Sequence, residues 1–206
     1  MRIVDISMTI ELDMAVYKNK PEKRPRLTVT QDFSKATTYE SSIHMDMHCG
    51  THLDAPRHVT VDGATVESQS LDQVVTKCKV LDLTHLTAKI TRADLATAQI
   101  VAGDFLLLKT QNSYSDSFRP DFIYLDADGA QYLSEKQVKG VGIDALGVER
   151  GQPTHPTHHI LLDQGISILE GLRLKEVDAG EYFLCAAPLK IKGAEAAPTR
   201  AILIAE

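Results

Sequence analysis

The chain has 206 residues, of which 43% are hydrophobic and 24% are charged, values typical of one globular domain with a sizeable core. The formal net charge is −6, which argues against nucleic acid as the main partner because phosphate binding requires a clustered positive surface. No apolar run approaches the ~20 residues of a membrane span, and Asp5 comes too early for a signal peptide. Three cysteines without a CxxC pair favour a reduced, cytoplasmic compartment over a disulfide framework or a zinc knuckle.

The order of predicted elements indicates an α/β fold. The first 60 residues show β-like alternation and few helix signals, which predicts antiparallel strands that flank the core. From residue 79 onward, strands and helices alternate, which implies a sheet that is at least partly parallel. No linker or repeat interrupts the chain, so we expect a single domain over residues 1–206. The predicted strands cover 79–83, 104–109, 140–144, 166–169, 181–191 and 200–205, and the predicted helices cover 91–100, 126–138 and 158–164.

Two nearby histidines require a turn in the chain. Strict alternation of apolar and polar residues over 42–49 predicts a half-buried strand with His48 on its polar face. A continued strand would separate His48 from His52 by about 13 Å, which is too far for two ligands of one metal. The chain must therefore turn between them, and Gly50 is where it can.

The residues that follow complete a typical ligand set for a catalytic metal. His48, His52 and Asp54 would supply two imidazoles and one carboxylate, leaving a coordination position for water or substrate. Pro56 favours the start of a helix, which would place His58 close to Asp54. A bound metal lowers the pKa of water from ~15.7 to about 7, and an imidazole such as that of His58 can shuttle a proton at neutral pH.

The clustering of the histidines favours a metal site over separate structural roles. Each histidine alone could be a surface or core residue, and Asp54 alone could be a turn former. However, seven of the eight histidines lie within residues 44–58 and 155–159, and core packing gives no reason for such clustering.

A second group of residues could hold another metal. His158 opens a predicted short helix and Glu170 ends the strand that follows, and such edges meet at the active face of α/β sheets. Paired metals ~3.5–4 Å apart can share a bridging carboxylate, for which Asp54 is the candidate. Alternatively, His158 lies near a helix cap and Glu170 pairs with a surface cation. His159 could replace His158 as ligand if the helix phase differs.

Together these segments resemble the cyclase family of metal-dependent hydrolases, which includes bacterial kynurenine formamidase and isatin hydrolase. Residues 48–58 read HCGTHLDAPRH and match the family signature HxGTHxDxPxH in full. The segment from His158 through Glu170-Gly171-Leu172 is also similar to the family. Further similarity lies in Asp5-Ile6-Ser7, Gly142-Ile143-Asp144 and Ala186-Ala187-Pro188-Leu189-Lys190.

The resemblance implies a mixed sheet core in a swivelling β/β/α arrangement, usually within a homo-oligomer such as a dimer or tetramer. It implies that His48, His52 and Asp54 bind a first divalent metal. In the two-metal members, Asp54 also contacts a second metal, held by the residues that match His158 and Glu170. Zinc is usual in the formamidase branch and manganese in the isatin hydrolase branch, so we expect one or two such ions per chain. The residue that matches the proposed general acid/base is His58.

The chain departs from the formamidases near its N-terminus. They carry an aromatic-Pro-Gly-Asp turn that helps to form the pocket, whereas residues 16–21 here read VYKNKP and the chain has no tryptophan. This departure weakens the case for N-formylkynurenine as substrate, and hence for a role in tryptophan catabolism. It leaves the predicted metal chemistry unchanged. Tyr17 is a candidate for the pocket wall, and Lys109, Thr110 and Asn112 follow a strand that could end there. Surface or capping roles are the alternatives for each of them.

We therefore predict an arylformamidase-like, metal-dependent amidohydrolase that acts on an amide-type C–N bond of a small molecule. His58 would take a proton from water and return it to the leaving nitrogen. A non-catalytic divalent-metal-binding protein is the alternative from another class, although its site would usually be closed by four protein ligands. Within the family, the alternatives are a cyclic-amide or cyclic-ester hydrolase and a lyase.

Overall fold

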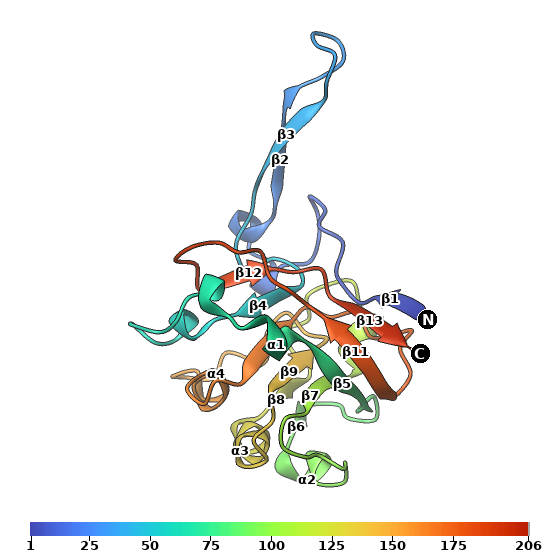
Figure 1. Ribbon diagram of the computed structural model, residues 1–206, viewed down its shortest axis with the longest axis vertical. Helices are drawn as coiled ribbons and strands as arrows, with labels where there is room; N and C mark the ends of the chain where they lie inside the picture. Colours follow the sequence, from blue (N-terminus) through green and yellow to red (C-terminus); the bar gives the residue numbers. More distant parts are fainter. Residues whose placement is uncertain (206) are drawn as a thin grey trace.

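The computed structural model describes residues 1–205 and contains one large mixed sheet (Figure 1). Its strand order is β1-β13-β11-β5-β7-β9-β10-β4-β12. The four central strands, β5, β7, β9 and β10, are parallel, and the strands on both sides of them are antiparallel. The strands of this sheet are β1 (Arg2–Asp5), β4 (His52–Asp54), β5 (Val75–Asp82), β7 (Phe105–Lys109), β9 (Gly140–Ile143), β10 (Ser167–Glu170), β11 (Gly180–Cys185), β12 (Ala196–Pro198) and β13 (Ile202–Ala205).

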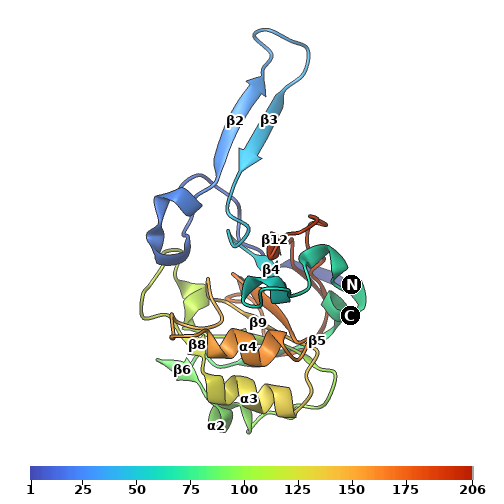
Figure 2. The same cartoon turned by 90° about the vertical axis from the view of Figure 1, so that its left-hand side faces the viewer.

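The helices lie mainly on one face of this sheet. In both views, α3 and α4 lie side by side next to the central strands (Figures 1 and 2). The helices are α1 (Leu71–Val74), α2 (Arg92–Leu95), α3 (Ala127–Glu135) and α4 (Pro156–Leu162), with short 3-10 turns at Tyr17–Asn19, Pro21–Lys23, Pro56–His58, Val66–Ser68 and Gln111–Tyr114. None of the helices in residues 1–205 has the length and apolar character that crossing a membrane requires.

The central strands are buried on both faces, as their continuous apolar sequences predict. Leu106 and Leu108 of β7 pack into the core beneath the helices. Phe105 and Leu107 point the other way, into a second core beneath β11 and β13. This alternation follows from the two-residue period of a strand. The predicted α/β fold with a mixed sheet is confirmed, and its parallel centre places the loops that follow β9 and β10 next to each other.

A separate hairpin projects from the body of the molecule. It consists of β2 (Arg26–Gln31) and β3 (Glu40–His44), which pair only with each other. Figure 2 shows it extending away from the end of the molecule opposite the helices. The second small sheet joins β6 (Lys89–Ile90) and β8 (Tyr124–Leu125).

Three predicted elements end at least five residues earlier than the sequence pattern indicates. The strand expected over 42–49 ends at His44 and is exposed rather than half-buried, because the following residues turn, with the Cys49 N–H donating to the Asp46 carbonyl. The helix expected over 91–100 has its capping box but covers only Arg92–Leu95. The strand expected over 181–191 ends at Cys185.

Candidate active site

The site lies where β4 pairs with β10. In this antiparallel pair, Glu170 is directly opposite His52. The register brings the His52 Nε2 to 3.3 Å from the Glu170 Oε2, and both side chains are buried. Two residues further along β4, Asp54 lies on the same face of the strand, because side chains alternate along it. Residues more than 100 positions apart in the sequence therefore face one another.

His48 reaches this group through a tight turn. Gly50 has φ +69°, in the left-handed region that glycine adopts at little cost. A Cβ at Gly50 would also lie 2.8 Å from the Ile10 Cδ1. Asp46 accepts a hydrogen bond from the His48 N–H and pairs with Lys23 at 3.2 Å. The predicted turn at Gly50 is therefore present, and it places His48 beside His52.

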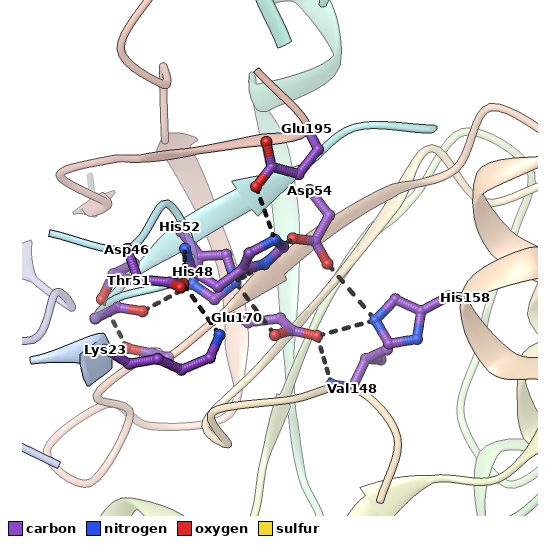
Figure 3. A network of polar contacts seen from close by, with 12 residues as sticks. Lys23, Asp46, His48, Thr51, His52, Asp54, Val148, His158, Glu170 and Glu195 are labelled. Carbon is purple, nitrogen blue, oxygen red and sulfur yellow. Dashed lines mark hydrogen bonds and ion pairs between the residues drawn. The ribbon is translucent and has the colours of Figure 1, made fainter. Parts of the chain in front are cut away.

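Three donor atoms converge as the ligands of one ion would (Figure 3). The His48 Nδ1 lies 3.0 Å from the Asp54 Oδ1 and 3.2 Å from the His52 Nε2, and that Oδ1 and Nε2 are 3.5 Å apart. Ligand atoms ~2.0–2.1 Å from a tetrahedral zinc lie roughly 3.3 Å apart. In addition, the His52 Nδ1–H can donate to the Gly50 carbonyl at 2.9 Å, which leaves its Nε2 free to face a metal.

The opposite side of Asp54 faces His158 and Glu170. The His158 Nε2 lies 3.6 Å from both the Asp54 Oδ2 and the Glu170 Oε1. His159 points elsewhere: its Nδ1 is 3.2 Å from Asp163, and its side chain is 42% exposed. Of the two histidines that the sequence left open, His158 is the one that the fold brings to the cluster.

Asp54 provides the test of whether these residues fit a metal. Both of its oxygens are buried, yet neither has a hydrogen-bond partner of acceptable geometry among residues 1–205. Buried carboxylates are costly unless they are paired or hydrogen-bonded. The group of His52, Asp54 and Glu170, and that of His48, Asp54 and His58, each hold ligand atoms within 4.8 Å of one another. A divalent cation would satisfy both oxygens of Asp54, so the donor set fits the metal.

Buried charges shift the pKa values within the cluster. Burial alone would lower the pKa of His52, but Glu170 and Asp54 outweigh it and raise the pKa to about 9. The same opposition raises the pKa of His158 to about 10, through Glu149, Glu170 and Asp54. Protons therefore compensate the two buried carboxylates when no metal is bound, and metal binding would displace them.

His58 behaves differently from the other histidines. It ends the 3-10 turn Pro56–His58, and its ring lies 4.2 Å from that of His48 and 5.3 Å from that of His158. Burial and the neighbouring histidines lower the pKa of His58. A neutral imidazole next to the metal-ligand group has the protonation state that a general base needs.

Two acidic residues near the cluster were missed by sequence reasoning. Glu195 approaches the His48 Nε2 at 3.7 Å from the segment before β12. Glu149 is buried behind His158, with its Oε1 3.3 Å from the His158 Nδ1. Neither residue lies in a recognisable motif, so only the folded chain reveals them.

The other candidates for the pocket wall differ in position. The ring of Tyr17 packs against Phe118 and Phe122, with centroids 5.4 and 6.3 Å apart. Burial and the charges of Glu170 and Glu149 raise its pKa, which places the phenol within electrostatic reach of the cluster.

Lys109, Thr110 and Asn112 instead make structural contacts. The Lys109 Nζ donates to the carbonyls of Lys175 and Val177 at 3.1 and 2.7 Å. Thr110 and Asn112 donate to Asp144. Thr110 therefore has the capping role considered for it from the sequence, since its hydroxyl accepts from the Asn112 N–H. Lys109, which is buried, and Asn112 anchor neighbouring segments instead, a role that the sequence did not indicate.

Comparisons with known proteins agree with this geometry. Residues 4–150 match the family model described as putative cyclase. The chain is 34% identical over 206 residues to kynurenine formamidase of Salinibacter ruber, covering 98% of this chain and 97% of that protein.

Solved structures show the same fold. A potential metal-dependent hydrolase with cyclase activity superimposes with a TM-score of 0.92 at 49% identity, covering 98% of this chain and 96% of that one. Isatin hydrolase A from Labrenzia aggregata superimposes with a TM-score of 0.85 at 25% identity, covering 100% and 94%. With its signature residues gathered in one buried cluster, this chain belongs to the cyclase family of metal-dependent hydrolases.

Proposed function

We propose that this chain is an arylformamidase-like hydrolase that cleaves the formyl C–N bond of an aryl formamide. The broader statement, that it is a metal-dependent hydrolase of C–N bonds other than peptide bonds, follows from the formamidase relatives and the isatin hydrolase neighbours. The observation that carries the proposal is Asp54, whose two oxygens are buried without hydrogen bonds between histidines on either side. A cation between the histidines would satisfy both oxygens.

The proposed roles follow the two sides of Asp54. His48, His52 and Asp54 would hold the first metal, and Asp54, His158 and Glu170 the second. A divalent ion supplies Lewis-acid chemistry, because it polarises a carbonyl and lowers the pKa of water. We propose zinc, since it prefers nitrogen and carboxylate ligands in tetrahedral sites, with manganese as the alternative.

His58 is the proposed general acid/base. It lies close to His48 and His158, and one of its ring nitrogens is within 4.8 Å of donor atoms of His48 and Asp54. Its lowered pKa keeps the imidazole neutral at physiological pH, so it can accept a proton from water. The imidazolium formed in this way then donates the proton to the leaving nitrogen, which avoids expelling an amide anion.

Aromatic residues support an aryl substrate. The ring of Tyr17 packs edge-on against Phe118 and Phe122, which are tilted relative to each other. The charge of Glu170 raises the pKa of the Tyr17 phenol. Aromatic rings favour offset or edge-on contact with other aromatic rings. We propose that Tyr17 takes the place of the aromatic residue in the N-terminal turn of the formamidases.

The test combines metal content with turnover. Elemental analysis of protein purified without chelator should show one or two zinc or manganese ions per chain, and hydrolysis of N-formylkynurenine should disappear on chelation and return with metal. Stoichiometric metal with no turnover of N-formylkynurenine would contradict the formamidase proposal but keep the metal site. Absence of metal after reconstitution would contradict both.

A cyclic amide is the second candidate substrate. The isatin hydrolase neighbour spans this whole chain with a TM-score of 0.85, and the formamidase turn is missing from residues 16–21. Parallel assays with isatin and N-formylkynurenine would separate the two, because the preferred substrate has the higher kcat/KM.

We also propose that the protein forms a homo-oligomer through the β2–β3 hairpin. An isolated two-stranded hairpin is at best marginally stable in water, yet this one projects with apolar side chains that are 45–73% exposed. The hairpin, residues 26–44, carries two Lys or Arg and two Asp or Glu, so it has no net charge. An uncharged arm with exposed apolar side chains favours an apolar interface, and we propose a second copy of this chain as the partner. The exposed side chains are Leu27, Val29, Phe33, Tyr39 and Ile43.

Sedimentation velocity tests this arrangement. Wild-type protein should sediment as a dimer or larger, and Phe33→Asp with Ile43→Asp should shift it to a monomer. Val61→Asp, at a side chain that is 82% exposed outside the hairpin, is the matched control and should leave the assembly intact. A monomeric wild type, or a double variant that still assembles, would contradict the proposal.

The free state of the three cysteines supports the proposed cytoplasmic location.

A further inference from the structure

A third buried carboxylate, besides Asp54 and Glu170, lies directly behind His158. Glu149 is 2% exposed and comes from the segment between β9 and α4. Its Oε2 accepts a hydrogen bond of 2.8 Å from the Thr157 N–H, and the Thr157 hydroxyl donates to the Leu125 carbonyl at 3.0 Å. One side of Glu149 is thereby fixed to the residue immediately before His158.

The hydrogen bond between Glu149 and the Thr157 N–H replaces the missing N-cap of α4. His155, at the N-cap position of α4, has φ +48° and makes no side-chain capping bond. The first N–H groups of a helix need an acceptor from outside the helix, and Glu149 provides one at Thr157. It therefore anchors the backbone turn from which His158 projects.

The other oxygen of Glu149 faces the ring of His158. The His158 Nε2 points to Asp54 and Glu170 at 3.6 Å, so a ring that binds metal through Nε2 must carry its remaining proton on Nδ1. That Nδ1 is buried and lacks a hydrogen bond of good geometry among the described residues. The Glu149 Oε1 lies 3.3 Å from it and is the acceptor that faces this proton. In His52 the corresponding Nδ1–H can donate to the Gly50 carbonyl at 2.9 Å.

His155 competes for this oxygen. Its Nδ1 lies 2.6 Å from the same Glu149 Oε1, closer than the His158 Nδ1 at 3.3 Å. The side chain of His155 is 56% exposed, whereas that of His158 is 7% exposed. His155 can exchange Glu149 for water, but His158 has no such substitute.

We propose that Glu149 is a positioning residue of the metal centre, which holds His158 with its proton on Nδ1 and its Nε2 lone pair directed between Asp54 and Glu170. The inference rests on the metal-binding part of the proposed function and extends it to a residue outside the ligand set. Partners of this kind orient a histidine ligand and increase its basicity, and their loss typically costs 10–100-fold in metal affinity.

The experiment measures zinc affinity by competition with a chromophoric chelator, using metal-free protein and each variant. The relevant zinc is the one whose binding His158→Ala removes. Glu149→Ala should weaken that zinc about 10–100-fold and should alter the visible spectrum of the cobalt-substituted protein. Glu149→Gln retains one acceptor oxygen for the His158 Nδ1–H and should recover part of the loss.

His155→Ala is the matched control, because it removes the competing partner of the same oxygen. It should leave the zinc affinity unchanged or increase it. Thermal unfolding of each metal-free variant separates a loss of metal affinity from a loss of folding. If Glu149→Ala does not fold, Glu149→Gln carries the test, and a weakened affinity together with a retained fold supports the proposal.

Three results would overturn it. Wild-type zinc affinity in Glu149→Ala, or in Glu149→Gln when only that variant folds, would show that His158 needs no partner. Equal weakening in His155→Ala and Glu149→Ala would assign the effect to the loop as a whole. A wild-type protein that binds no metal would overturn the proposed function as well, whereas the first two results leave that function intact.

Discussion

Two buried aspartates of this chain have opposite surroundings. Asp54 and Asp144 are each 1% exposed. Asp144 accepts hydrogen bonds from the N–H and hydroxyl groups of Thr110 and Ser113, at 2.7–3.2 Å, and from the Asn112 amide. Asp54 has imidazole nitrogens at 3.0–3.6 Å but no hydrogen bond of good geometry among residues 1–205.

The difference separates a structural carboxylate from one prepared for a ligand. Donors on several sides of Asp144 fix the loop after β7, so its oxygens are already hydrogen-bonded within the chain. A buried group without such donors is rarely tolerated unless function requires it. Asp54 therefore marks the site more clearly than burial or charge alone, and the two residues should respond differently to substitution.

The largest expected effect is the loss of function in Asp54→Asn. This variant should lose bound metal and measurable turnover, while the free energy of unfolding of the metal-free protein changes little, because the Asp54 oxygens make no hydrogen bond of good geometry among residues 1–205 that the substitution would break. Zinc at 100 times its Kd should stabilise the wild type by about 2.7 kcal/mol and leave the variant unchanged. Chemical denaturation with and without zinc measures both quantities. Retained metal in Asp54→Asn would contradict its role as a ligand.

His58→Ala should separate catalysis from metal binding beside Asp54. We expect kcat to fall about 10²–10⁴-fold with the metal content unchanged, because His58 is assigned a proton and no ligand position. Elemental analysis and steady-state kinetics on the same preparation provide the test. Loss of metal in proportion to activity would make His58 a ligand instead.

Asp144→Ala should show the reverse pattern. Removing the acceptor leaves the buried N–H groups of Thr110 and Ser113 without partners, which should cost about 3 kcal/mol of unfolding free energy. Metal affinity per folded molecule should be retained. If Asp144→Ala lost less unfolding free energy than Asp54→Asn, Asp54 and not Asp144 would be the structural carboxylate.

The two neighbouring histidines sharpen the comparison within a single helix. His158→Ala should remove one metal, whereas His159→Ala should change metal content not at all and stability by less than about 0.5 kcal/mol, as is usual for exposed positions. Metal titration of both variants decides between them. A larger loss of metal in His159→Ala than in His158→Ala would mean that α4 is rotated so that His159 faces the cluster.

The smallest expected effect concerns Asp94, a carboxylate that is satisfied but lies near the surface. Hydrogen bonds from Thr91 outweigh partial burial and hold the pKa of Asp94 below its usual value of 3.8. Because the pKa of Asp94 is lower in the folded state than in the unfolded state, its ionised form stabilises the fold above pH 3.8. This stabilisation is lost as the pH falls from 3.8 through the folded pKa. Asp94→Ala should therefore cost about 1 kcal/mol at neutral pH and less in acid. An equal cost at both pH values, measured by denaturant unfolding, would exclude the charge as the cause.

Local sequence was sufficient for one half of the site. The signature over 48–58 places four candidate residues within eleven positions, and Gly50 and Pro56 set the turns between them. For that reason the proximity of His48, His52, Asp54 and His58 could be predicted. The capping box at Thr91 and the buried strand at 105–109 were also predictable, because both depend on near neighbours in the chain.

The other half was decided by strand pairing and helix phase. Glu170 meets His52 only through the register of β10 with β4, and His158 is chosen over His159 only by the rotation of α4. Glu149 and Glu195 carry no motif and reach the cluster from separate loops.

The sequence by itself determined which chemical groups are available and which of them are neighbours along the chain, because turns, caps and strand periodicity act over a few residues. Only the tertiary structure decided which side of Asp54 each histidine faces and which carboxylates lie behind them. It also decided that the 26–44 segment leaves the body as a hairpin. These features depend on sheet order and packing between distant segments, and no local pattern encodes the distance between two such side chains.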